Sequence, residues 1–155
     1  MKQVIIFAVL FTSCKFLHAQ QQPTLELSFN HLALSVKDLD RSVDFYKGVL
    51  GLSEITNKTE VKGIRWFSLG QGKELHLISD AYYKRDNVIT NKAIHMALTT
   101  NNFDQLIKTF DANNIHYSDW PGTDKKINIR ADGIKQIYLQ DPDGYWIEIN
   151  SAAEK

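Results

Sequence analysis

The sequence predicts an α+β domain made of two copies of one β-α-β-β-β module. The first indication is a repeated segment: residues 29–36, Phe-Asn-His-Leu-Ala-Leu-Ser-Val, return 64 positions later as residues 93–100, Ala-Ile-His-Met-Ala-Leu-Thr-Thr. The second is that each copy is followed by a stripe of helical spacing and then by alternating strands. An internal repeat of this size indicates two similar modules that share a core. Module one covers about residues 27–80 and module two about residues 92–151 of a single domain spanning 27–151.

Both copies of the repeated segment have the pattern of a two-faced strand, because successive side chains of a strand point to opposite sides. Leu32, Leu34 and Val36 share the apolar face of the first copy. The opposite face carries a histidine with small neighbours, and His31 and His95 hold the same place in the two copies. This pattern predicts a core on one side and a shallow cavity on the other.

The rest of module one follows from spacing and turn residues. Asp38 or Asp40 is suited to cap a helix, and Gly51 is suited to end it. The apolar stripe between them has helical spacing and consists of Leu39, Val43, Tyr46 and Leu50. Three strands are then expected, at 52–60, 64–69 and 74–78. A turn at Gly70-Gln71-Gly72 joins the last two strands.

Module two repeats this order with a longer loop. Asn101 or Asn102 is expected to cap its helix. The helix has apolar residues Phe103, Leu106, Ile107 and Phe110, and strands are expected at 115–118, 135–140 and 145–150. Aligning residues 75–77 with 147–149 leaves eight extra residues in module two, which match the loop 119–133. A loop of this length is often functional or mobile. Its basic residues Lys125, Lys126 and Arg130 are interpreted as a solvated surface, with contact to an anionic substrate as the alternative.

The first residues have the pattern of a signal peptide, 1–19, with cleavage after Ala19. A positive start precedes an apolar run at 4–11 that is too short to span a bilayer. We therefore expect a periplasmic or secreted protein with no membrane attachment after cleavage. An uncleaved anchor and lipidation at Cys14, the only cysteine, are the alternatives. The formal net charge is zero, with 18 basic and 18 acidic residues, so nucleic acid is not an expected partner.

Four side chains form the candidate metal site. They are mid-strand residues with apolar neighbours on the opposite face, two in each module: His31, His76, His95 and Glu148. Three imidazoles and a carboxylate suit a divalent transition metal such as Zn, Ni, Co, Mn or Fe. If the modules pack with pseudo-two-fold symmetry, the four groups can converge. A lone histidine in a strand is more often a hydrogen-bonded structural residue, but repeat-equivalent positions are harder to explain that way. Trp66 and Tyr138 are candidate substrate-binding residues, with ordinary packing as the alternative.

With these motifs, the chain resembles the vicinal oxygen chelate superfamily, which includes glyoxalase I, fosfomycin resistance proteins and extradiol dioxygenases. The resemblance rests on residues 29–36, 40–46 (Asp-Arg-Ser-Val-Asp-Phe-Tyr), 48–52 (Gly-Val-Leu-Gly-Leu) and 141–148 (Asp-Pro-Asp-Gly-Tyr-Trp-Ile-Glu). It implies paired βαβββ modules that form a cupped mixed sheet around a metal, with His31, His95 and Glu148 at ligand positions. His76 stands where glyoxalase I-like lyases usually have a glutamate. A homodimer is also suggested by the resemblance.

The expected function is a metal-dependent lyase or isomerase, glyoxalase-like in fold, that acts on a small substrate with two adjacent oxygens. The substrate would chelate the metal while a proton moves, and Glu148, the only carboxylate of the set, is the candidate base. If His76 does not bind the metal, two histidines and Glu148 form the ligand set typical of non-haem iron oxygenases, which favours an extradiol-type dioxygenase. A non-enzymatic binding or resistance protein of the same fold is the third alternative.

Overall fold

A computed structural model describes residues 26–79 and 90–152. The predicted signal peptide and most of the connection between the modules lie outside the described residues. The elements occur in this order: β1 (His31–Val36), α1 (Leu39–Asp44), η1 (Phe45–Val49), β2 (Glu54–Ile55), β3 (Ile64–Gly70), β4 (Lys73–Ser79), β5 (His95–Thr99), α2 (Phe103–Ala112), β6 (Asn128–Ile129), β7 (Lys135–Gln140) and β8 (Trp146–Asn150).

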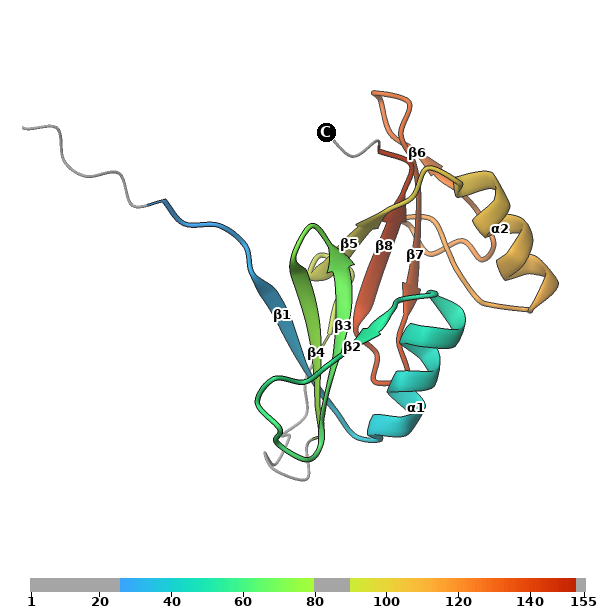
Figure 1. Ribbon diagram of the computed structural model, residues 1–155. Coiled ribbons are helices and arrows are strands. Elements are labelled where there is room, and N and C mark those ends of the chain that lie inside the picture. The colour runs from blue at the N-terminus through green and yellow to red at the C-terminus, as the bar shows by residue number, and fades with distance from the viewer. Residues whose placement is uncertain (1–25, 80–89, 153–155) are drawn as a thin grey trace, which may run out of the picture.

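The strands form two four-stranded sheets with the same topology. The first sheet has the order β1-β4-β3-β2 and the second has the order β5-β8-β7-β6. The parallel pairs are β1 with β4 in the first sheet and β5 with β8 in the second. The other neighbouring strands are antiparallel. Figure 1 shows the two modules beside each other, with α2 next to the second sheet. The predicted α+β fold of two β-α-β-β-β modules is therefore confirmed.

The repeat also holds in the strand register. Ala33 pairs with His76 in the first sheet, and Ala97 pairs with Glu148 at the equivalent place in the second. On the other side, Trp66 is opposite His76 and Tyr138 is opposite Glu148. Each module therefore surrounds one candidate ligand with a small residue and an aromatic residue. This symmetry follows from the offset of 72 residues between the final strands.

The first helix begins and ends as the sequence predicts, but it changes type midway. The Asp38 carboxylate accepts a hydrogen bond from the Arg41 backbone N–H at 3.0 Å, which satisfies a free donor of the first turn. From Phe45 to Val49 the backbone widens into a π-helix. Gly51 follows with a φ of 68°, a left-handed conformation that favours glycine.

Two predicted strands are shorter or absent. The expected strand 52–60 is limited to Glu54–Ile55. Beyond it, the Asn57 side chain donates to the carbonyls of Val61 and Ile64 and accepts from Thr59, so the chain turns instead. The expected strand 115–118 is replaced by isolated bridges from Ser118 to Asp124 and to Tyr138. At Asn57 side-chain hydrogen bonds compete with the ladder, which strand propensity does not describe. At Ser118 the backbone pairs with that of Tyr138 at a single position.

The cap of the second helix also differs from the prediction. Asn102 occupies the cap position, but its side chain makes no capping hydrogen bond. Its own backbone N–H donates to the Thr100 hydroxyl at 3.1 Å. The helix ends as expected, with Asn114 in the left-handed region at a φ of 53°.

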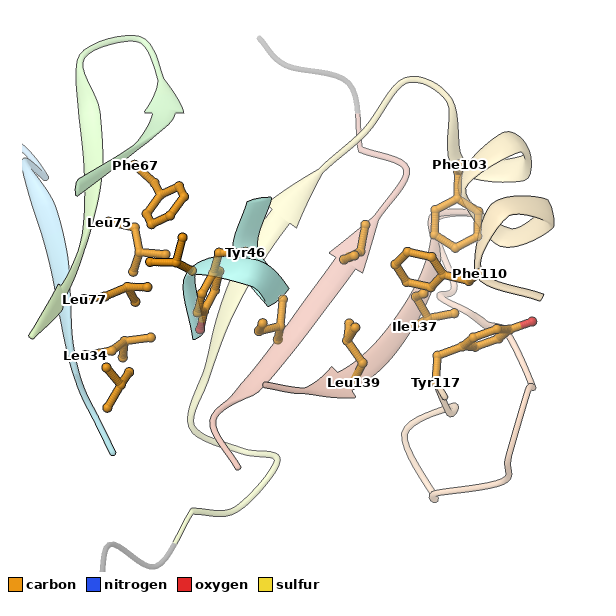
Figure 2. Close-up of a cluster of buried hydrophobic side chains, with 14 residues drawn as sticks. Leu34, Tyr46, Phe67, Leu75, Leu77, Phe103, Phe110, Tyr117, Ile137 and Leu139 are labelled. Carbon is orange, nitrogen blue, oxygen red and sulfur yellow. The ribbon is translucent and has the colours of Figure 1, made fainter. Parts of the chain in front are cut away.

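One continuous hydrophobic core joins the two modules. Figure 2 shows Leu34, Leu75 and Leu77 of the first sheet pointing toward Tyr46, with Ile137 and Leu139 of the second module farther along the same cluster. Buried leucines and isoleucines alternate along β4 and β8 with the candidate ligands. Because neighbours in a strand point to opposite faces, the ligand faces of both sheets point away from this core.

A buried hydrogen bond joins the two modules at the edge of the core. The Tyr46 hydroxyl donates to the Asp141 carboxylate at 2.8 Å. That carboxylate also accepts from the backbone N–H groups of Asp143 and Tyr145. Burial raises the pKa of Asp141, and these hydrogen bonds oppose the rise. The turn 141–144, predicted as turn structure, therefore also connects the modules.

Within the described residues, no helix has the length and apolar character needed to cross a membrane.

Candidate metal site

The second module brings two of the four predicted ligands together. His95 Nε2 lies 3.3 Å from a carboxylate oxygen of Glu148. His95 Nδ1 lies 2.8 Å from the Lys92 carbonyl, which can only accept, so we assign the Nδ1 proton to this bond. The Nε2 lone pair then faces a carboxylate, and two such acceptors repel unless a proton or a metal ion lies between them. The residues of this half fit a cation.

Glu148 is held as an ionised, immobile carboxylate. It is only 6% exposed. One oxygen accepts from the Asn150 amide and the other from the Tyr138 hydroxyl, both at 2.8 Å. Burial alone would raise the pKa of Glu148, but the hydrogen bonds from Asn150, Tyr138 and Gln136, together with the nearby His95, outweigh burial and lower it. Partners that orient a ligand in this way are typical of metal sites.

Replacing Tyr138 with phenylalanine is expected to weaken metal binding without unfolding the protein. Tyr138→Phe removes the donor to Glu148, so the pKa of Glu148 should rise and the carboxylate should gain freedom. We expect metal affinity to fall by about 10- to 100-fold, the usual effect of losing such a partner. A chelator competition titration measures the affinity. Tyr117→Phe is the matched control, because Tyr117 donates to Asp111 outside the site; equal losses in both variants would contradict this role of Tyr138.

The first module brings the other two predicted ligands together in a column of rings. The His31 and His76 rings stack with centroids 4.4 Å apart and planes 14° apart. His76 in turn stacks on Trp66 at 4.0 Å and 6°. His31 Nδ1 lies 2.7 Å from the Asn30 side-chain oxygen. With that oxygen as acceptor, His31 has its Nε2 lone pair available, as His95 does.

His76 differs from the other two histidines, because its Nε2 is already engaged. It lies 2.9 Å from a carboxylate oxygen of Glu74. Sequence reasoning missed Glu74 as a site residue. The available signal was its spacing, since residues two apart in a strand share a face. Asn150 was missed for the same reason, two residues after Glu148 on β8.

The two candidate ligands of each module lie next to each other, but those of module one do not meet those of module two within one chain. Over residues 26–79 and 90–152, no three side chains of His, Cys, Asp or Glu form a group that could hold a metal ion. The physical reason is the shared core, because both ligand faces point away from it. The predicted convergence of all four groups is therefore not seen within a single chain.

The long loop of module two is anchored by hydrogen bonds. Asp119 is 3% exposed, and its carboxylate accepts from the backbone N–H groups of Gly122 and Thr123. Burial alone would raise the pKa of Asp119, but the Thr123 hydrogen bonds and the neighbouring Lys126 ammonium lower it. The three basic residues of the loop each face a carboxylate: Lys125 with Asp111, Lys126 with Asp119, and Arg130 with Asp132.

The topology defines a class of protein, the domains built from two paired βαβββ modules. The chain belongs to the Glyoxalase/Bleomycin resistance protein/Dioxygenase superfamily, whose family model matches residues 28–149.

Two solved structures and one curated relative illustrate the similarity. A metallothiol transferase, FosB, from Staphylococcus epidermidis is 29% identical over 134 residues, covering 83% of this chain and 84% of that protein. A lactoylglutathione lyase from Agrobacterium tumefaciens has a TM-score of 0.63 at 19% identity, covering 83% of this chain and 96% of that one. A glyoxalase/dioxygenase from Nostoc punctiforme has a TM-score of 0.63 at 24% identity, covering 82% and 92%. The two structures support the fold alone.

Proposed function

We propose that this protein is an exported, metal-dependent enzyme that acts on a small substrate with two adjacent oxygens, and that two copies of the chain build each active site. His31 of one copy and His95 with Glu148 of the other would hold the metal. The observation that supports this best is that each module presents half of a ligand set on a face turned away from its own core. A second copy can complete both halves where one chain cannot.

The edges of the sheets support a paired assembly. Over the described residues, β1 and β5 stand at the ends of the two strand orders. His31, Ala33, His95 and Ala97 on these strands are exposed. Exposed strand edges readily pair with another chain. If β1 of one copy lies beside β5 of the other, a two-fold axis produces two identical sites, as isologous dimers require.

The ligand set we favour has three members. His31 and His95 each have Nδ1 next to an acceptor and Nε2 available, and Glu148 is ionised. Two imidazoles and one carboxylate fit a divalent transition metal such as iron, manganese or zinc. When bound, such a metal acts as a Lewis acid for a substrate that chelates it through two oxygens. His76 is the fourth candidate, but Glu74 already occupies its Nε2.

A lyase or isomerase reaction also needs a group that accepts a proton. Glu148 is one candidate, but both of its oxygens accept hydrogen bonds. His76 is the better-placed group. Its ring is fixed between His31 and Trp66, and Glu74 fixes Nε2, so a proton can be held at Nδ1. We therefore assign metal binding to Glu148 and proton movement to His76.

A second candidate function is an extradiol-type dioxygenase. One observation favours it: with His76 bonded to Glu74, the remaining ligand set is two histidines and a carboxylate, the arrangement of non-haem iron oxygenases. Three ligands leave more open positions at the metal than four do. The identity of the metal separates the two candidates.

The test is elemental analysis of the purified protein, prepared without a histidine tag. We expect about one transition metal per chain, with iron favouring the dioxygenase and zinc, nickel, cobalt or manganese favouring the lyase or isomerase. Absence of metal after soaking in these ions would leave a non-enzymatic binding protein as the better account. The intact mass of the same sample, taken from a periplasmic or secreted fraction, tests export and cleavage after Ala19.

Replacing His76 with alanine separates three ligands from four. We expect His76→Ala to retain metal within about threefold of the original affinity, because a group bonded elsewhere contributes little. Turnover of any substrate found should fall sharply in the same variant. His116→Ala is the matched control, since His116 is exposed and faces Asp124. Loss of the metal from His76→Ala would show that His76 is a ligand.

A further inference from the structure

The loop that only module two has brings an indole to the ligand face of the second sheet. The Trp120 and Tyr138 rings have centroids 5.4 Å apart and planes at 70°. The hydroxyl of Tyr138 is bonded to Glu148, so Trp120 is one residue removed from a proposed metal ligand. The Trp120 side chain is still 48% exposed. A large aromatic ring left half-exposed beside a ligand has surface to offer a bound molecule.

The backbone that carries the indole is held in place before any ligand binds. The Lys92 ammonium donates to the carbonyls of Asp119 and Trp120 and to the Ser118 hydroxyl, at 2.8–3.2 Å. Asp119 closes the turn from inside through the N–H groups of Gly122 and Thr123. A surface that is already ordered loses little conformational entropy on binding. Trp120 is therefore positioned as part of a rigid wall.

Charge on this wall favours a neutral group over an anion. Lys125, Lys126 and Arg130 each face a carboxylate. Lys92 has three oxygen acceptors for its three N–H bonds, and its ammonium lies 5.3 Å from the centre of the Tyr138 ring and 4.7 Å from that of Trp146. Beside Glu148, this wall therefore offers a ligand the aromatic surfaces of Tyr138 and Trp120, and each of these four basic side chains already has an acceptor or a carboxylate partner.

We propose that Trp120 is a specificity-determining residue, whose indole packs against an apolar, ring-bearing part of the substrate while the two oxygens of that substrate occupy the metal. This inference rests on the proposed function, since it assumes the metal site beside Glu148. Ring pairs prefer edge-to-face or offset stacking, and Trp120 already packs edge-on against Tyr138. Its exposed surface would receive the substrate ring. Small polar chelators would make no use of this contact.

Two hydroxamates that differ only in one group test the proposal. Acetohydroxamate and benzohydroxamate present the same pair of oxygens, but one has a methyl and the other a phenyl group. Their affinities for the full protein loaded with Zn²⁺ are measured by calorimetry. We expect benzohydroxamate to bind about tenfold more tightly, from burial and stacking of its ring. Trp120→Ala should remove this preference and leave acetohydroxamate unchanged, and Trp120→Phe should retain most of it. Ile129→Ala, at an exposed apolar residue on β6 within the same segment 119–133, should have no effect.

The outcomes distinguish failure of this inference from failure of the metal site on which it depends. Equal affinities for the two hydroxamates, or a phenyl preference that survives in Trp120→Ala, would overturn the role of Trp120 and leave the metal site standing. A loss of acetohydroxamate binding in Trp120→Ala would also overturn it, because the residue would then support the site as a whole. Failure of the zinc-loaded protein to bind either hydroxamate would overturn the proposed function, and the inference with it.

Discussion

A heterodimer of His31→Ala and Glu148→Ala chains should regain metal that neither variant binds alone. In a homodimer of either variant, both composite sites lack a ligand. In the heterodimer, one site contains both substitutions, while the other combines the intact His31 of one chain with the intact His95 and Glu148 of its partner. Purified heterodimers should therefore hold about half the metal of the original dimer. Co-expression with two different non-histidine tags, sequential affinity purification and elemental analysis measure this.

The matched control uses two substitutions in one half of the site. His95→Ala and Glu148→Ala chains both lack a ligand from module two, so their heterodimer has no intact site and should stay free of metal. Recovery of metal only in the first pairing would identify the two-chain site. No recovery in either pairing, with the metal content of the single variants already low, would point to ligands that meet within one chain.

The fold could be predicted because it repeats itself. His31 and His95, 64 positions apart, mark equivalent strands, and the pairing of Trp66 with His76 matches that of Tyr138 with Glu148. The errors occurred where local hydrogen bonds or isolated backbone bridges take the place of a strand ladder. Asn57 shortened one expected strand, and Ser118 makes bridges where another was expected. Such competition depends on where single polar groups lie, which periodicity does not record.

For the site, the sequence predicted which residues share a face but not how the faces are arranged. Alternation in a strand places His95 and Glu148 on one side of their sheet, and the structure brings them together. This alternation does not indicate whether the ligand faces of the two sheets point toward each other. That depends on the core, where Tyr46 packs between the modules. The contributions of Lys92 and Trp120 were equally hidden, since both reach the site through a loop fold that no local pattern describes.

The connection between the modules makes Tyr46 a residue whose loss should be severe. It is fully buried, and its hydroxyl donates to Asp141 across the junction. Tyr46→Ala should lower the free energy of unfolding by about 3–5 kcal/mol, as expected for removing a buried aromatic side chain. Tyr46→Phe keeps the packing but leaves a buried carboxylate oxygen without its hydroxyl donor, which should lower it by about 1–3 kcal/mol. Urea unfolding monitored by circular dichroism measures both.

The pH dependence of Tyr46→Phe shows whether the carboxylate is the cause. Burial raises the folded-state pKa of Asp141, and the Tyr46 hydrogen bond opposes that rise, so the variant should have a still higher pKa. A carboxyl group with a raised folded-state pKa contributes stability that is present below its unfolded pKa and is lost as pH rises through the folded one. The loss of unfolding free energy in Tyr46→Phe should therefore be largest at neutral pH and shrink as pH falls toward about 4, near the ordinary aspartate pKa.

Tyr145→Phe is the comparison, because the Tyr145 hydroxyl also joins the modules but donates to the neutral carbonyl of Ser35. The loss of stability in Tyr145→Phe should be smaller and should not change with pH in this way. If the loss in Tyr46→Phe is equally independent of pH, the buried charge of Asp141 is not what weakens the junction.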